Sequence, residues 1–192
     1  DPLWSRGLGD VYKRQLLRPS VQLPAILIIE IAVGRHLMAH GIQPQALIGH
    51  SMGENAAACL AGVFSFADAV RLVRLRGELF DTIAPGGMLS VPMDPAALKA
   101  RLPEALDLAS VNAPQFCVVS GLNEDLEAFR QSLAADGIDA TRVPIDIAAH
   151  SRMLDAILPR FEAFLRTIRI GAPRIPICLL YTSDAADDLL CV

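Results

Sequence analysis

The sequence predicts an α/β protein in which a small α/β unit interrupts a larger one. A short apolar run at 46–51 leads through a glycine-rich turn into small, helix-forming residues, which indicates a strand followed by a helix. Residues 88–145 then alternate between strand-like and helix-like patterns. A mostly helical segment at 148–165 follows, and we expect it to return the chain to the larger unit.

The first helix is predicted at 22–40. Pro24 suits its first turn, because a proline there loses no intrahelical hydrogen bond, and Gly41 suits its end. The most apolar stretch of the chain, 23–34, carries Glu30 and is too short to span a bilayer. We therefore expect no membrane partner.

Two more helices are predicted after the strand. Residues 51–63 have small side chains, which allow a helix to pack closely against a sheet. Ser65 and Asp68 form the pattern S-x-x-D, which is typical of a helix cap, before a helix at 66–83. The larger unit is thus predicted to pack helices around the strand at 46–51.

The small unit has a strand order with a known counterpart. Its strands are predicted at 88–91, 106–112, 115–121 and 140–146, and its helices at 94–102 and 123–137. The order β-α-β-β-α-β is the ferredoxin-like pattern. The sequence therefore predicts a ferredoxin-like subdomain inserted at 88–145.

Both ends of the chain are interpreted as translated sequencing adapter, at 1–15 and 178–192. Residues 10–15 can be encoded GAT GTG TAT AAG AGA CAG. The reverse complement of that string, shifted by one base, encodes residues 178–182 and the start of the next codon. Both ends also resemble the mosaic end that a transposase ligates onto DNA. We expect residues 16–177 to be a fragment of a longer gene.

Composition excludes several classes of protein. Of the four cysteines, only Cys59 and Cys117 lie outside the predicted adapter, and they have neither metal-site nor disulfide spacing. A reduced, cytoplasmic location is expected. The formal net charge of −4 argues against a nucleic-acid partner.

The stretch LIGHSMGE at 47–54 contains the pattern G-x-S-x-G, which predicts a nucleophile elbow. Gly49 and Gly53 would let the backbone bend sharply and expose the hydroxyl of Ser51. The backbone N–H of Met52, at the start of the next helix, is the expected oxyanion donor. The pattern alone leaves a second interpretation open, in which Ser51 only caps the helix.

His150 is the candidate general base, because it lies between small residues where the chain returns to the larger unit. The alternative is a surface histidine that caps the last helix. His36 and His40 lie four residues apart, with no further ligand spaced to form a metal site. His50 precedes Ser51, and its side chain is expected to point away from it. No metal is expected.

Arg76 interrupts an apolar helix face. That face consists of Ala69, Leu72, Val73, Leu79, Phe80 and Ile83. A buried guanidinium needs an anion, and its planar fork suits a carboxylate. Two kinds of partner fit equally well: a structural carboxylate such as Glu54 or Glu30, or the carboxylate of a substrate.

With these residues identified, the chain resembles the acyltransferase domains of polyketide synthases. It is also similar to the malonyl-CoA:acyl carrier protein transacylases of fatty-acid synthesis. The matching stretches are IGHSMGENAAACLAGVFSFADAVRLVRLRGELF at 48–80, PGGMLSV at 85–91, NAPQFCVVSG at 112–121 and AAHSRMLD at 148–155. They have the family's order and separations. The resemblance is closer to the synthase domains than to the stand-alone enzymes.

The resemblance implies a hydrolase-like three-layer core, incomplete here, at 16–87 and 146–177, with the ferredoxin-like insert between these segments. It implies that Ser51 takes an acyl group from a coenzyme A thioester, with His150 as base and then acid. Arg76 would bind the carboxylate of a malonyl-type group. The acceptor would be the phosphopantetheine thiol of an acyl carrier protein, and a ketosynthase could neighbour the domain in the parent chain. No bound cofactor is implied.

Two departures from the family limit these expectations. The glycine-glutamine motif that supports the family's oxyanion hole is absent, so we expect this chain to be inactive even if its parent gene encodes an active enzyme. The residues before the base are Ile147, Ala148 and Ala149, which match neither the His-Ala-Phe-His nor the Tyr-Ala-Ser-His pattern. The extender unit therefore stays open. A serine hydrolase or editing thioesterase, and a non-catalytic carrier-docking fragment, remain as alternative functions.

Overall fold

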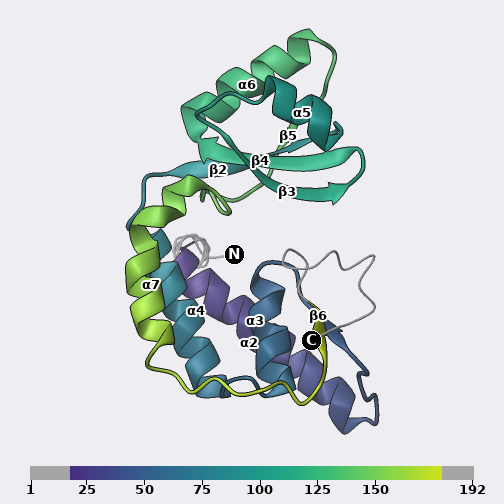
Figure 1. The fold of residues 1–192 in the computed structure, drawn as a ribbon, viewed down its shortest axis with the longest axis vertical. Helices are drawn as coiled ribbons and strands as arrows, with labels where there is room; N and C mark the ends of the chain where they lie inside the picture. The colour runs from purple at the N-terminus through teal and green to yellow at the C-terminus, as the bar shows by residue number, and fades with distance from the viewer. Residues whose placement is uncertain (1–17, 179–192) are drawn as a thin grey trace, which may run out of the picture. The chain divides into compact units, whose positions relative to one another are not determined.

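The computed structural model describes residues 18–178. The first predicted adapter segment and residues 179–192 of the second lie outside the described residues. The chain divides into two compact units (Figure 1). The first unit combines the residues up to Asp81 with those from Arg160 onward, and the second is Thr82–Pro159.

The first unit is mainly helical. Its elements are α2 (Pro19–Ala39), β1 (Leu47–Ile48), α3 (Met52–Ala61), α4 (Phe66–Phe80) and β6 (Ile177–Cys178), and α7 (Leu158–Leu165) leads into it from the second unit. Strands β1 and β6 pair in parallel, with Leu47 opposite Ile177 and Ile48 opposite Cys178. This pairing includes Cys178, the first residue of the second predicted adapter segment. The strand predicted at 46–51 is shorter in the structure, where two residues pair with β6.

Helix α2 begins earlier than the sequence predicts. Pro19 occupies its first turn, and Pro24 lies inside the helix, so the placement of Pro24 at the start was wrong. The physical reason is that a first-turn position needs only a fixed φ, and the upstream Pro19 already provides it. The buried residues Leu23, Leu27 and Ile31 lie four apart and form the buried stripe of the helix.

Helix α2 packs against α3 and α4. Its approach to α4 is close at Gly77, where an added Cβ would lie 2.5 Å from the carbonyl oxygen of Pro19. The outer side of α2 exposes several large apolar side chains: Val21, Ile26, Ile28, Ile29, Val33 and Leu37. By length and composition alone, α2 is also long and apolar enough to cross a membrane, a test that core helices of soluble proteins pass as well.

The predicted cap of α4 is confirmed. The Ser65 hydroxyl accepts a hydrogen bond from the backbone N–H of Asp68 at 3.0 Å and donates one to the Asp68 carboxylate at 2.7 Å. The preceding helix α3 ends at Gly62, whose φ of 82° is the left-handed conformation that glycine adopts most easily. The two helices therefore begin and end through local signals that the sequence displays.

The second unit has one four-stranded antiparallel sheet, with the order β3-β4-β2-β5. Its elements are β2 (Gly86–Val91), α5 (Pro95–Arg101), β3 (Asp107–Ala113), β4 (Phe116–Leu122), α6 (Asn123–Ala135) and β5 (Thr141–Arg142). Helices α5 and α6 lie on the same face of the sheet (Figure 1). Leu98 of α5 and Leu126 of α6 share a buried core with Leu89 and Val119 of the sheet.

The end of the second unit differs from the prediction of one mostly α-helical segment at 148–165. A 3₁₀ helix at Arg152–Ile157 comes first, and α7 follows it. Strand β5 is likewise shorter than predicted, because only Thr141 and Arg142 pair with β2. His150 lies between β5 and the 3₁₀ helix, in neither a strand nor a helix.

Candidate active site

Ser51 lies at the turn between β1 and α3. Its backbone has φ 51° and ψ −107°, which a non-glycine residue adopts only under strain. Ser51 occupies the N-cap position of α3, but its side chain makes no capping hydrogen bond. The geometry therefore favours the elbow over the interpretation of Ser51 as a simple cap.

The two glycines of the motif are not equivalent. A Cβ added at Gly49 would lie 2.2 Å from the backbone nitrogen of Glu54, whereas one added at Gly53 would have no neighbour within 4 Å. The turn thus requires glycine at 49, because the first turn of α3 passes directly over it. The expectation that Gly53 is also needed for the bend has no steric support.

The backbone donors at the start of α3 differ in their partners. The N–H of Gly53 donates to the carbonyl of His50 at 3.0 Å, and the N–H of Glu54 donates to the carbonyl of Ser51 at 3.2 Å. Among residues 18–178, the N–H of Met52 has no backbone acceptor. The first N–H groups of a helix form an electropositive end that suits an oxyanion.

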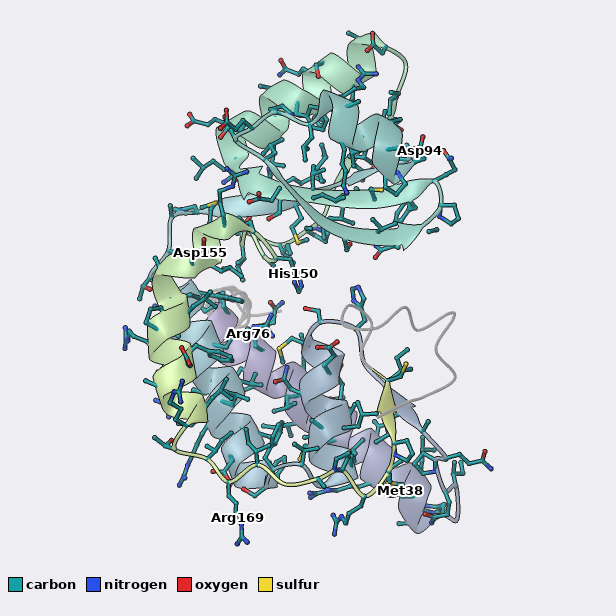
Figure 2. The ribbon with its side chains drawn as sticks, in the orientation of Figure 1. Met38, Arg76, Asp94, His150, Asp155 and Arg169 are labelled. Carbon is teal, nitrogen blue, oxygen red and sulfur yellow. The ribbon has the colours of Figure 1, made fainter. Side chains whose placement is uncertain are left out.

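Arg76 lies close to this helix start. Its Nη1 is 3.6 Å from the sulfur of Met52, and its guanidinium carbon is 5.3 Å from the ring centre of Phe80. Figure 2 shows the Arg76 side chain pointing from α4 toward the beginning of α3. The first unit therefore brings together Arg76 and the residue that follows Ser51.

Neither predicted structural carboxylate pairs with Arg76. Within the described part of the chain, no carboxylate oxygen lies within 4.0 Å of its guanidinium. Burial lowers the pKa of Arg76, and the charge of Glu54 opposes that shift from a greater distance. Glu30 has a buried oxygen without a hydrogen-bond partner, and burial raises its pKa. The half-buried guanidinium thus retains its capacity to bind an anion.

His150 belongs to the second unit. Figure 2 shows it on the side of the sheet away from α5 and α6. Its φ is 56°, again in the left-handed region. Of the expected specificity residues, Ala148 is fully buried, and Ile147 and Ala149 are half-buried.

An ion pair near His150 was not indicated by the sequence. Arg152, two residues after His150, pairs with Asp107 at the start of β3. The two residues are 45 positions apart. Arg152 lies in the stretch AAHSRMLD, but nothing in the sequence indicates its pairing with Asp107. Asp107 is the one residue near this site that sequence reasoning missed.

His36 and His40 form a histidine pair on α2. The rings of His36 and His40 are 4.3 Å apart, and Nδ1 of His40 lies 2.8 Å from the carbonyl oxygen of His36. In the part of the chain that the structure describes, no three His, Cys, Asp or Glu side chains are placed to hold a metal ion.

Comparison with known families gives this geometry its context. Residues 13–191 match the family model of the acyl transferase domain. The chain belongs to the acyl transferase domain family. Like solved members of that family, it has an α/β fold of mixed helices and sheets.

The similar curated proteins are polyketide synthases. The component PikAIII of the pikromycin polyketide synthase of Streptomyces venezuelae is 36% identical over 163 residues, which are 83% of this chain and 10% of that protein. The spectinabilin polyketide synthase system protein NorA′ of Streptomyces orinoci is 40% identical over 165 residues, which are 83% of this chain and 5% of that protein. The chain thus spans about a tenth or less of the length of these relatives.

Three solved structures are similar in both fold and sequence. The acyltransferase domain from the second module of the salinomycin polyketide synthase has a TM-score of 0.81 and 34% identity, with 85% of this chain and 40% of that chain covered. The acyltransferase domain of SpnD in complex with 2-(pent-4-yn-1-yl)malonyl has a TM-score of 0.78 and 37% sequence identity, with 83% of this chain and 39% of that chain covered. The malonyl CoA-acyl carrier protein transacylase of Coxiella burnetii has a TM-score of 0.79 and 26% sequence identity, with 85% of this chain and 55% of that chain covered.

Proposed function

We propose that this acyltransferase moves a malonyl-type acyl group from coenzyme A to the phosphopantetheine thiol of an acyl carrier protein, by way of an ester on Ser51. The observation that carries the proposal is the half-buried Arg76, which touches Met52 beside the nucleophile and has no carboxylate oxygen within 4.0 Å among the described residues. The similar SpnD domain has been solved with a substituted malonyl group, which fits a cargo that carries a free carboxylate.

The chemistry follows from the named atoms. The Ser51 hydroxyl attacks the thioester carbonyl while His150 accepts its proton, and the carbonyl oxygen becomes an oxyanion. The N–H of Met52 donates to that oxyanion at the electropositive end of α3. The C–S bond then breaks, and coenzyme A leaves as a thiol with the proton from His150. The carrier thiol reverses these steps and takes the acyl group.

Arg76 supplies selectivity in this scheme. A guanidinium that has lost part of its hydration gains most from a partner that accepts two parallel hydrogen bonds, and a carboxylate does so. A neutral acetyl group would leave the guanidinium of Arg76 without such a partner. The arginine therefore favours a carboxylated cargo. Ile147, Ala148 and Ala149 are the proposed contacts that choose among such cargoes.

We also propose the finer architecture. Residues 16–87 and 146–177 would form a hydrolase-like three-layer core, with a ferredoxin-like insert at 88–145 and adapter-derived residues at both ends. The order β3-β4-β2-β5, with one helix after β2 and one after β4, supports the ferredoxin-like insert.

The proposed setting is a cytoplasmic synthase with an acyl carrier protein and a neighbouring ketosynthase as partners, and without nucleic acid or membrane. The polyketide synthase relatives support this context. The described cysteines are free, and Cys59 and Cys117 are buried, which fits a reduced environment.

The test of the acyl-serine uses residues 16–177 in a domain completed with the glycine-glutamine segment of a relative. After mixing with malonyl-CoA, mass spectrometry should find the malonyl mass on the peptide that contains Ser51. The Ser51→Ala variant should carry none. Equal labelling of both proteins would refute the proposal, and rapid release of free malonate without carrier protein would instead favour the hydrolase alternative.

A further inference from the structure

The backbone at His150 needs an external restraint. A non-glycine residue in the left-handed region is strained and persists only where its surroundings hold it. His150 is exposed, so core packing of its own side chain does not supply that restraint. The contacts of the residues on both sides of His150 hold the chain there.

The side before His150 is held by packing. Ala148 is fully buried, and a Cβ added at Gly86 would lie 2.7 Å from the Cβ of Ala148, so the chain lies directly against β2. Ser151 spans the turn itself: its hydroxyl donates to the Ala148 carbonyl at 2.7 Å and accepts from the Met153 N–H at 3.3 Å. These contacts close the turn locally but do not attach its far end to the sheet.

The side after His150 is held by Asp107. One carboxylate oxygen of Asp107 accepts a hydrogen bond from the backbone N–H of Arg152 at 2.9 Å. The guanidinium of Arg152 contacts the same carboxylate through Nε at 3.0 Å and 3.2 Å and through Nη2 at 2.9 Å. Asp107 itself is fixed in the sheet, where it pairs with Ser120 of β4.

This arrangement differs from an ordinary surface ion pair. Exposed pairs contribute little, because solvent screens them and both side chains lose freedom. Here one partner of the carboxylate is a backbone N–H, so the bond fixes the position of the main chain. Only 23% of the Asp107 side chain is exposed. Burial alone would raise the pKa of Asp107, but its bonds to Arg152 outweigh that effect and hold the pKa below its usual value.

We infer that Asp107 is a positioning residue for His150: by holding the backbone and side chain of Arg152, it maintains the left-handed turn that directs the imidazole. Its value for acyl transfer rests on the proposed role of His150 as the base. Its hold on the turn does not depend on that role.

The test compares Asp107→Ala with the matched control Glu127→Ala in the full chain. Glu127 also accepts bonds from an arginine, Arg130, but on α6 and away from His150. Hydrogen exchange should accelerate about tenfold or more at the Arg152 amide in Asp107→Ala, because a protected donor loses its acceptor. Exchange at this amide should not change in Glu127→Ala. The Arg152→Ala variant keeps its backbone N–H and should show a smaller increase than Asp107→Ala.

A second readout follows the imidazole. Nitrogen NMR of the histidine rings, assigned with His150→Gln, should show altered His150 signals in Asp107→Ala and unchanged signals for His36 and His40. If Asp107→Ala unfolds, Asp107→Asn provides the same comparison with a milder change. Unchanged exchange at Arg152 together with unchanged His150 signals would overturn the inference. Loss of Ser51 labelling in the completed wild-type domain would count only against the proposed function.

Discussion

At the residue scale, strain coincides with the proposed chemistry. Among the described residues, Ser51 and His150 are the two non-glycine residues with positive φ. They are also the two residues that the sequence predicts as nucleophile and base. Such conformations survive where the surrounding structure enforces them, and they are frequent at functional sites. Each unit thus contains one strained residue, and the proposed acyl transfer would give each of them a role.

Gly49 permits the first of these turns, which gives a prediction. In Gly49→Ala, the new Cβ would meet the backbone of Glu54 at 2.2 Å, and backbone cannot move aside as a flexible side chain can. We expect a loss of about 1–3 kcal/mol in the free energy of unfolding, the usual cost of overpacking.

Urea unfolding of the chain measures this loss. Gly53→Ala is the matched control, because nothing lies within 4 Å of its added Cβ and alanine favours a helix. A similar loss in both variants would contradict the steric account of the elbow.

At the element scale, the link between β3 and the turn after His150 predicts a dependence of stability on pH. The Asp107 pKa is lower in the folded chain than its ordinary value of 3.8, so the folded state favours the charged carboxylate. The stabilisation is therefore present above pH 3.8 and is lost as the pH falls through the lower folded pKa. The charges of Glu104 and Asp155 also act on Arg152.

We expect the stability difference between Asp107→Asn and the wild type to disappear at low pH. Asp107→Asn should lower the urea midpoint at pH 7, and the gap from the wild type should shrink as the pH falls below about 4. Urea titrations at several pH values measure the gap. A gap that stays constant down to about pH 2.5, well below the ordinary range of an aspartate, would show that the carboxylate charge of Asp107 contributes nothing.

Elements differ in how far the sequence predicts them. The helix at 66–83 has both an apolar periodicity and a local cap at Ser65, and the structure contains it at Phe66–Phe80. Strand β1 depends on a partner more than a hundred residues away, so its short extent was not visible locally. The Asp107–Arg152 bridge likewise joins residues 45 apart. Local signals therefore predict roles for Ser51, Arg76 and His150, whereas the contact of Asp107 depends on long-range pairing that no local signal indicates.

At the scale of the whole molecule, exposed large apolar side chains gather on the outer face of α2 more than on any other element among residues 18–178. Ile29 is 62% exposed and Val33 is 53% exposed, and the two lie one helical turn apart. Soluble monomers rarely expose a contiguous patch of this kind. We expect the isolated chain to self-associate through α2.

Charged substitutions on that face test this expectation. The double variant Ile29→Glu with Val33→Glu should shift the chain toward monomer in analytical ultracentrifugation while it keeps its helical circular dichroism. Leu27→Glu, at a fully buried position of the same helix, should instead unfold it. Undiminished association in the double variant would place the contact elsewhere.

Arg76 is proposed to select a carboxylated acyl group for Ser51. The direct measurement is the ratio of Ser51 acylation rates with malonyl-CoA and acetyl-CoA, in the completed domain and in its Arg76→Ala variant. This ratio should fall by about 30-fold or more in the variant, because the malonyl carboxylate loses its charged partner whereas the acetyl group has none to lose. Equal losses for both donors would contradict it.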